Sequence, residues 1–171
     1  MMRTIPVLAA MVSLAHAQSP PAQAAVTVGG KKITIEYSAP SVHGRQIFGP
    51  GGLLSRDPTY PAWRAGANSA TAFHTDADLD VGGLNVPKGD YTLYCWVQDP
   101  NAWQLIINKE TGQWGLEYNA RQDVGRVKMT MSTPPAVVEM LKYTLTALGG
   151  NKAQLQIAWE KHAGTVPITM K

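Results

Sequence analysis

The sequence has little charge and almost no cysteine. Only 16% of its 171 residues are charged, and Cys95 is the single cysteine. One cysteine excludes an internal disulfide, and collagen-like and coiled-coil proteins need a far more biased composition. The 15 basic and 12 acidic residues leave a net charge of +3, which is too small to indicate a nucleic-acid partner. Cys95 lies in an apolar run and is expected to be a small buried hydrophobic residue.

Sequence signatures of common catalytic and metal sites are absent too. The motifs G-x-S-x-G, S-x-x-K, H-E-x-x-H and G-x-x-x-x-G-K-[ST] do not occur. Asp76–Asp80 imitates the start of a calcium loop, but Val81 stands where that loop needs glycine. Outside the first 17 residues the histidines are His43, His74 and His162, none within four residues of another. We therefore expect no metal site and no cofactor.

The first 17 residues predict a secretory signal peptide. Met1, Met2 and Arg3 give a positive start, and Ile5–Leu14 is apolar but shorter than the roughly 20 residues that span a bilayer. Ala15-His16-Ala17 supplies the small-x-small pattern of a cleavage site, and a second such site allows a cut after Ala24. No other apolar segment reaches spanning length. The expected location is the periplasm or the medium, without membrane insertion.

The remaining chain predicts an all-β fold. Residues 18–25 are expected to form a flexible lead, and residues 26–171 a single domain. Short apolar, β-branched and aromatic runs alternate with Gly, Pro, Asn and Asp, which is typical of a single antiparallel β-sandwich or a jelly-roll-like barrel of about 8–10 strands. One segment also fits a helical period, but the Gly149-Gly150-Asn151 turn after it favours a hairpin. The expected strands are Val26–Val28, Ile33–Tyr37, Thr71–Thr75, Leu79–Val81, Tyr91–Val97, Trp103–Asn108, Val124–Met131, Val137–Ala147, Gln154–Trp159 and Val166–Met170.

A long segment rich in Gly and Pro, Ala39–Ala62, separates two polar clusters. Loops of this length are uncommon in compact domains and are often functional. A guanidinium group recognises carboxylate or phosphate, and an indole offers a stacking surface. The same arginines could instead bind loop carbonyls, because buried polar groups must be satisfied. The candidate ligand-binding residues are Arg45, Arg64, Asn68, Trp63 and Trp114.

Six motifs occur in a fixed order: Ile35–Arg45, Trp63–Thr71, Val86–Leu93, Trp103–Lys109, Gln113–Gly115 and Ala158–Lys161. Together they resemble the bacterial secreted family catalogued as domain of unknown function 2911, over about Val26 to Ile168. The resemblance implies a signal-peptide-bearing all-β domain and no established activity. The arginines and the asparagine of the family's G-R and W-R-x-G-A-N motifs map onto Arg45, Arg64 and Asn68. Phe48–Tyr60 is longer than the corresponding loop of the family.

Three hypotheses about function follow. We expect a small periplasmic or secreted binding module, whose candidate residues contact a polar or anionic ligand such as a glycan or a cell-envelope fragment. The less favoured alternative is a hydrolase acting on envelope polymers, with Asp76, Asp123 or Glu160 as acids or bases. The third is a structural or interaction domain, in which exposed aromatic residues are buried against a partner. Whether the protein is an enzyme, and its oligomeric state, stay open at the level of sequence.

Overall fold

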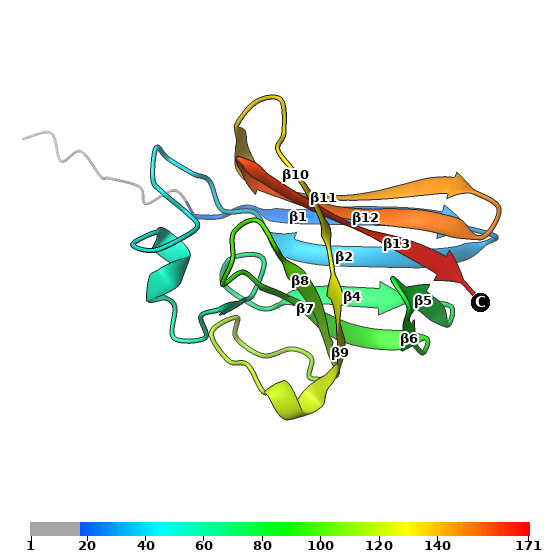
Figure 1. Cartoon of the computed structure of the whole chain (residues 1–171). Helices are drawn as coiled ribbons and strands as arrows, with labels where there is room; N and C mark the ends of the chain where they lie inside the picture. The colour runs from blue at the N-terminus through cyan, green and yellow to red at the C-terminus, as the bar shows by residue number, and fades with distance from the viewer. Residues whose placement is uncertain (1–17) are drawn as a thin grey trace, which may run out of the picture.

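The computed structural model describes residues 18–171, which form two antiparallel β-sheets packed face to face (Figure 1). The predicted signal peptide, residues 1–17, lies outside the described residues. The all-β prediction is confirmed, and the architecture is a sandwich and not a closed barrel. Regular helix in the described part is limited to two short 3₁₀ turns, η1 (Leu53–Arg56) and η2 (Ala120–Gln122). No helix within residues 18–171 is long and apolar enough to cross a membrane.

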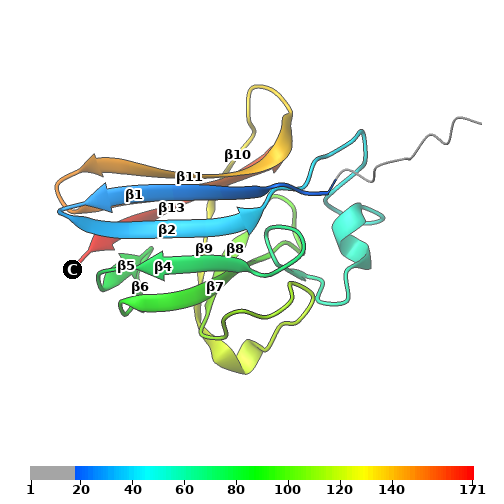
Figure 2. The ribbon, with the colours of Figure 1, turned by 180° about the vertical axis from the view of Figure 1, so that it is seen from behind.

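The first sheet has the strand order β1-β2-β4-β7-β8-β9, with β3 paired to the far end of β7. Figure 2 shows β1, β2, β4 and β7 of this sheet side by side. Its strands are β1 (Pro21–Val28), β2 (Lys31–Ser38), β3 (Ala62–Trp63), β4 (Thr71–Thr75), β7 (Gly89–Trp96), β8 (Gln104–Asn108) and β9 (Asp123–Lys128).

The second sheet has the order β11-β12-β13-β5-β6, with β10 also paired to β13. Its edge strand β11 lies beside β1 (Figures 1 and 2), so the two sheets approach each other along this side. Its strands are β5 (Leu79–Val81), β6 (Leu84–Val86), β10 (Thr130–Ser132), β11 (Val138–Gly149), β12 (Lys152–Glu160) and β13 (His162–Met170).

The core lies between the sheets. It is filled by the side chains at every second position of each strand, which point inward. Its centre is aromatic: Phe48, from the long loop, has its ring centroid within 5.6 Å of Trp63, 5.0 Å of Trp103 and 6.1 Å of Trp159. Trp63 and Trp159 stack on each other at 5.6 Å. Cys95 is fully buried, as expected, and burial raises the pKa of its thiol well above the ordinary value.

Three sequence expectations need correction. The flexible lead over residues 18–25 is wrong for most of its length, because β1 begins at Pro21 and pairs with β2 over eight residues. The strand expected over Val124–Met131 is two strands, β9 and β10, which lie in different sheets with Met129 at the crossing. Residues 18–171 contain thirteen strands, more than expected. The additional ones include the two-residue β3 and the three-residue β6, which are too short to show a period.

The pairing of β1 with β2 predicts how N-terminal truncation changes the stability of the fold. A chain that begins at Ala25 lacks the partners of Tyr37 and Ser38 and two further register pairs, together with the buried Ala24. We expect it to be about 2–4 kcal/mol less stable than a chain that begins at Gln18, at about 1 kcal/mol per backbone hydrogen bond. Urea unfolding measures the difference. A chain that begins at Pro20 is the control and should match the Gln18 chain; equal stability of all three would mean that the start of β1 contributes nothing.

Candidate functional site

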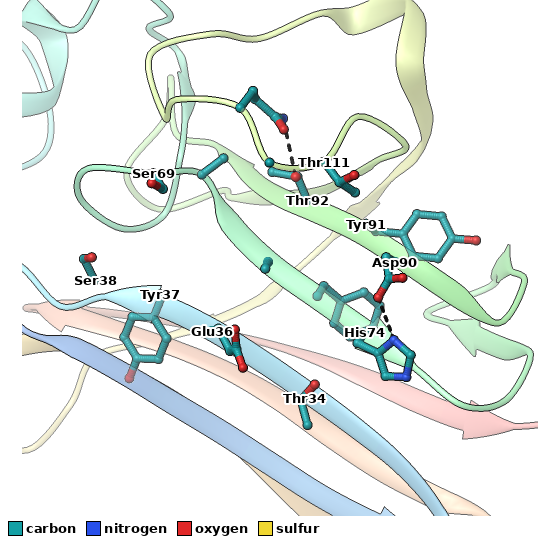
Figure 3. A pocket seen from close by; sticks show the side chains of 15 residues that line it. Thr34, Glu36, Tyr37, Ser38, Ser69, His74, Asp90, Tyr91, Thr92 and Thr111 are labelled. Carbon is teal, nitrogen blue, oxygen red and sulfur yellow. Dashed lines mark hydrogen bonds and ion pairs between the residues drawn. The ribbon is translucent and has the colours of Figure 1, made fainter.

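A groove of about 700 Å³ crosses the outer face of β2, β4 and β7 (Figure 3). Because side chains alternate along a strand, the buried Ile33 and Ile35 leave Thr34 and Glu36 pointing outward from β2. On the neighbouring strand β4 the exposed position opposite Glu36 is Ala72, whose side chain is a single methyl group. The small side chain leaves a trough between its larger neighbours. The groove lining comprises Thr34, Glu36, Tyr37, Ser38, Ser69, Ala70, Ala72, Phe73, His74, Asp90, Tyr91, Thr92, Thr111, Gly112 and Gln113.

One wall of the groove comes from the loop that follows β8. Gln113 Nε2 donates to Tyr94 Oη at 2.9 Å and to Thr92 Oγ1 at 3.4 Å, and Thr92 Oγ1 donates to the carbonyl of Glu110 at 2.7 Å. A bridge between Ser69 and Trp114 joins the same loop to the segment before β4. The Gln113 Oε1 atom is buried and has no hydrogen-bond partner in the protein. The wall is therefore held by polar contacts and contains an unused acceptor.

His74 lies at one end of the groove between two carboxylates. Its Nε2 is 2.9 Å from Asp76 Oδ1 and its Nδ1 is 2.7 Å from Asp90 Oδ1. The hydrogen bonds to Asp76 and Asp90 raise the pKa of His74 above 6.5, and the bond from His74 lowers the pKa of Asp76. When both ring nitrogens are protonated, each donates to one of these carboxylates, and the contact to Asp90 positions that side chain on the groove.

The chemistry of the groove is that of hydrogen bonding without a strong positive charge. Hydroxyl, amide and carboxylate groups line it, and neither Lys nor Arg is among its lining residues. Glu36 and Asp90 are exposed there. Such a surface can accept hydrogen bonds from ligand hydroxyl or amino groups and disfavours an anionic ligand. Among residues 18–171, no group of three or more His, Cys, Asp or Glu could hold a metal ion.

The structure brings together three of the five candidate residues, but outside the groove lining. Gly115 packs against the side chain of Arg64, and its N–H donates to the Asn68 carbonyl at 3.0 Å. Trp114, next to it, is 51% exposed. Arg64 Nη1 lies 3.6 Å from Asp57, while its Nε and Nη1 are buried without a hydrogen-bond partner. Burial lowers the pKa of this guanidinium and the nearby Asp57 opposes the shift.

The two other candidates have structural positions. Trp63 is 1% exposed and belongs to the core, so the expectation that it contacts a ligand is wrong. Arg45 donates from Nη2 to the carbonyl of Ser41 at 2.7 Å and from Nε to that of Val42 at 3.0 Å. It therefore ties down carbonyls of its own loop, which is the alternative that the sequence left open for it.

The carboxylates considered as acids or bases each serve a separate part of the fold, and none of them lines the groove. Asp76 accepts from His74 and, at 2.9 Å, from the N–H of Lys32. The remaining two also accept hydrogen bonds from the fold. Asp123 accepts from Asn108 Nδ2 at 2.8 Å and Tyr118 Oη at 2.7 Å, and Glu160 from the N–H of Ile47 at 2.8 Å.

Fold and groove define the class: a small all-β sandwich with an open polar groove on the outer face of one sheet. The chain belongs to the family described as protein of unknown function (DUF2911), which matches residues 19–168. This confirms the resemblance drawn from the six motifs. No curated protein and no solved structure matches the chain.

The double hydrogen bond of His74 can be tested by titration. We expect NMR to find the pKa of His74 above 6.5, and Asp76→Asn and Asp90→Asn each to lower it, because each removes a charged acceptor. Since the folded pKa is the higher one, the stabilisation is complete below pH 6.5 and is lost as pH rises through the folded value. Asp99→Asn, on a turn that does not contact His74, is the control. An unshifted pKa in both test variants would contradict the contact.

Proposed function

We propose that the protein is a small ligand-binding module whose groove takes a neutral or amine-bearing polyhydroxyl compound, such as a glycan fragment. The supporting observation is a preformed trough of about 700 Å³ whose lining includes hydroxyl, amide and carboxylate groups beside apolar and aromatic surface. Its volume falls within the roughly 300–1,000 Å³ of typical small-molecule sites. The rigid strands beneath hold these groups in place, so little ordering entropy is lost on binding.

The groove favours a different ligand charge from the one that the arginines suggested. Glu36 and Asp90 face it, whereas Arg45 and Arg64 are absent from its lining. A carboxylate accepts hydrogen bonds from the hydroxyl and amino groups of a sugar, and it repels a uronic acid or a phosphorylated sugar. The proposal therefore keeps the glycan part of the sequence hypothesis and assigns no anion to this site.

We further propose that the module acts outside the cytoplasm, in the periplasm or the medium. The support is the sequence pattern of residues 1–17, with its positive start, apolar stretch and Ala15-His16-Ala17. Fractionation of cells that express the full chain tests this directly. Unprocessed protein found only in the cytoplasmic fraction would overturn it.

Filling the trough tests the proposed site. We expect Ala72→Phe to weaken binding of neutral and amino-sugar oligosaccharides at least tenfold, because the new ring occupies the floor between β2 and β7. Isothermal titration against a panel of these sugars, with uronic-acid oligosaccharides as the anionic comparison, measures the effect. Ala72 is exposed, so its replacement should leave the core and the thermal unfolding temperature unchanged.

Ala147→Phe is the matched control, since Ala147 is also an exposed strand alanine but lies on β11 of the other sheet. It should bind as the unmodified protein does. Absence of binding to every neutral and amino sugar, equal affinity of Ala72→Phe, or preference for the uronic acids would each reject the groove as the proposed glycan site.

A further inference from the structure

A second pocket, of about 420 Å³, lies away from the groove at the turn between β12 and β13. We call it the turn pocket. Its polar side chains come from three places in the chain: the turn before β8, the end of β10 with the residue after it, and the β12–β13 turn. The turn pocket is lined by Asn101, Met131, Ser132, Thr133, Lys161 and His162.

The charge of the turn pocket is the reverse of that of the groove. Lys161 brings an ammonium group, Asn101 an amide and Ser132 a hydroxyl, and no acidic residue is among the lining residues. Glu160, next in sequence, is held elsewhere: its Oε2 accepts from the N–H of Ile47 at 2.8 Å. Glu160 also has a φ of 56°, a conformation that a non-glycine residue keeps only when its surroundings hold it. No carboxylate among the lining residues therefore neutralises the charge of Lys161.

His162 presents one edge of its ring to this pocket. Phe48 and Trp103 pack against the ring, with centroids at 4.8 Å and 6.1 Å. Nδ1 is buried without a hydrogen-bond partner and lies 3.9 Å from Glu160 Oε1, while 19% of the side chain stays exposed. Nε2, on the other edge of the ring, is not among the buried side-chain atoms that lack a partner. Desolvation by burial lowers the pKa of His162 and so favours the neutral ring.

We propose that the turn pocket binds an oxyanion, a sulfate or phosphate group, between the Lys161 ammonium, the His162 ring and the hydroxyls of Ser132 and Thr133. A tetrahedral oxyanion offers several acceptors, which suits donors that converge from three segments. The site shares no lining residue with the groove. The oxyanion proposal is therefore independent of the proposed glycan binding, and failure of one does not decide the other.

Binding at this site is coupled to a proton on His162. An anion beside Nε2 favours the imidazolium, which then donates from Nε2 to the anion and points its Nδ1–H at Glu160. The charged groups that act on the ring are Glu160 and Lys161 of its own turn. Phe48 and Trp103, packed on the ring, are uncharged. Oxyanion affinity should therefore rise as pH falls.

Sulfate is the sharpest probe, because its own charge is constant between pH 5 and pH 8. We expect an NMR-monitored titration of the chain from residue 18 to residue 171 to give a sulfate affinity that is several-fold tighter at pH 5.5 than at pH 7.5. By linkage, saturating sulfate should raise the pKa of His162. Lys161→Gln should weaken sulfate binding about tenfold, the loss of one charge-assisted contact. Lys152→Gln, at the other end of β12, is the matched control and should bind normally.

A comparison of phosphate ligands and the titration of His162 complete the test. Inorganic phosphate and a sugar phosphate, compared at pH 5.5, distinguish a free anion from an esterified one, and binding of either supports the site. If His162→Gln fails to fold, because the ring packs on Trp103, the His162 titration in the unmodified chain still decides. No sulfate-induced shift of His162, or equal sulfate affinity of the Lys161→Gln and Lys152→Gln variants, would overturn the proposal.

Discussion

The packing of Phe48 among three tryptophans is the contact that holds the rest of the structure in place. Trp63, Trp103 and Trp159 belong to both sheets or to the segments that lead into them, and Phe48 comes from the long loop. Burying these four large aromatic side chains removes a large apolar surface from water. Through this contact the Gly- and Pro-rich loop packs into the core and does not run over the surface, and Ile47 and Leu54 of the same loop are also buried. The ring of His162 is packed at the edge of this cluster, which is why a titratable group there is poorly hydrated.

The inner faces of both sheets are occupied by this core, and the two pockets on the outside of the molecule differ in charge. The groove on β2, β4 and β7 carries Glu36 and Asp90, whereas the turn pocket carries Lys161 and His162. The net charge of +3 therefore does not describe the local charge at either pocket. At physiological salt, charges act over about 8 Å, so the proposed ligand of each pocket would meet the charge of that pocket's own lining and not that of the whole molecule.

Most of the fold could be predicted from the sequence, but little of the site could. Alternation of Ile33, Ile35 and Tyr37 is a local property, and it indicates a strand whatever its neighbours are. The groove is different, because Ala72 forms a trough only when β4 lies between β2 and β7, an order that no single segment encodes. Gly115, next to Trp114, packs against Arg64 and bonds to the Asn68 carbonyl, a contact between segments far apart in sequence, while Trp63 is drawn into the core by its own apolar area. The sequence gives no sign that Glu160 adopts a left-handed conformation, since any residue type other than glycine is unusual there.

The position of β13 in the second sheet sets an order of events for the nascent chain. This last strand is not at an edge: it lies between β12 and β5, and Ile168 pairs with Val81. A ladder between segments this far apart in sequence closes slowly, because loop-closure entropy must be overcome before the contacts form. The second sheet is therefore complete only when β13 has joined it. Until then the β5–β6 hairpin lacks its neighbouring strand, while the first sheet and the β11–β12 hairpin need no residue of β13 for their own pairing.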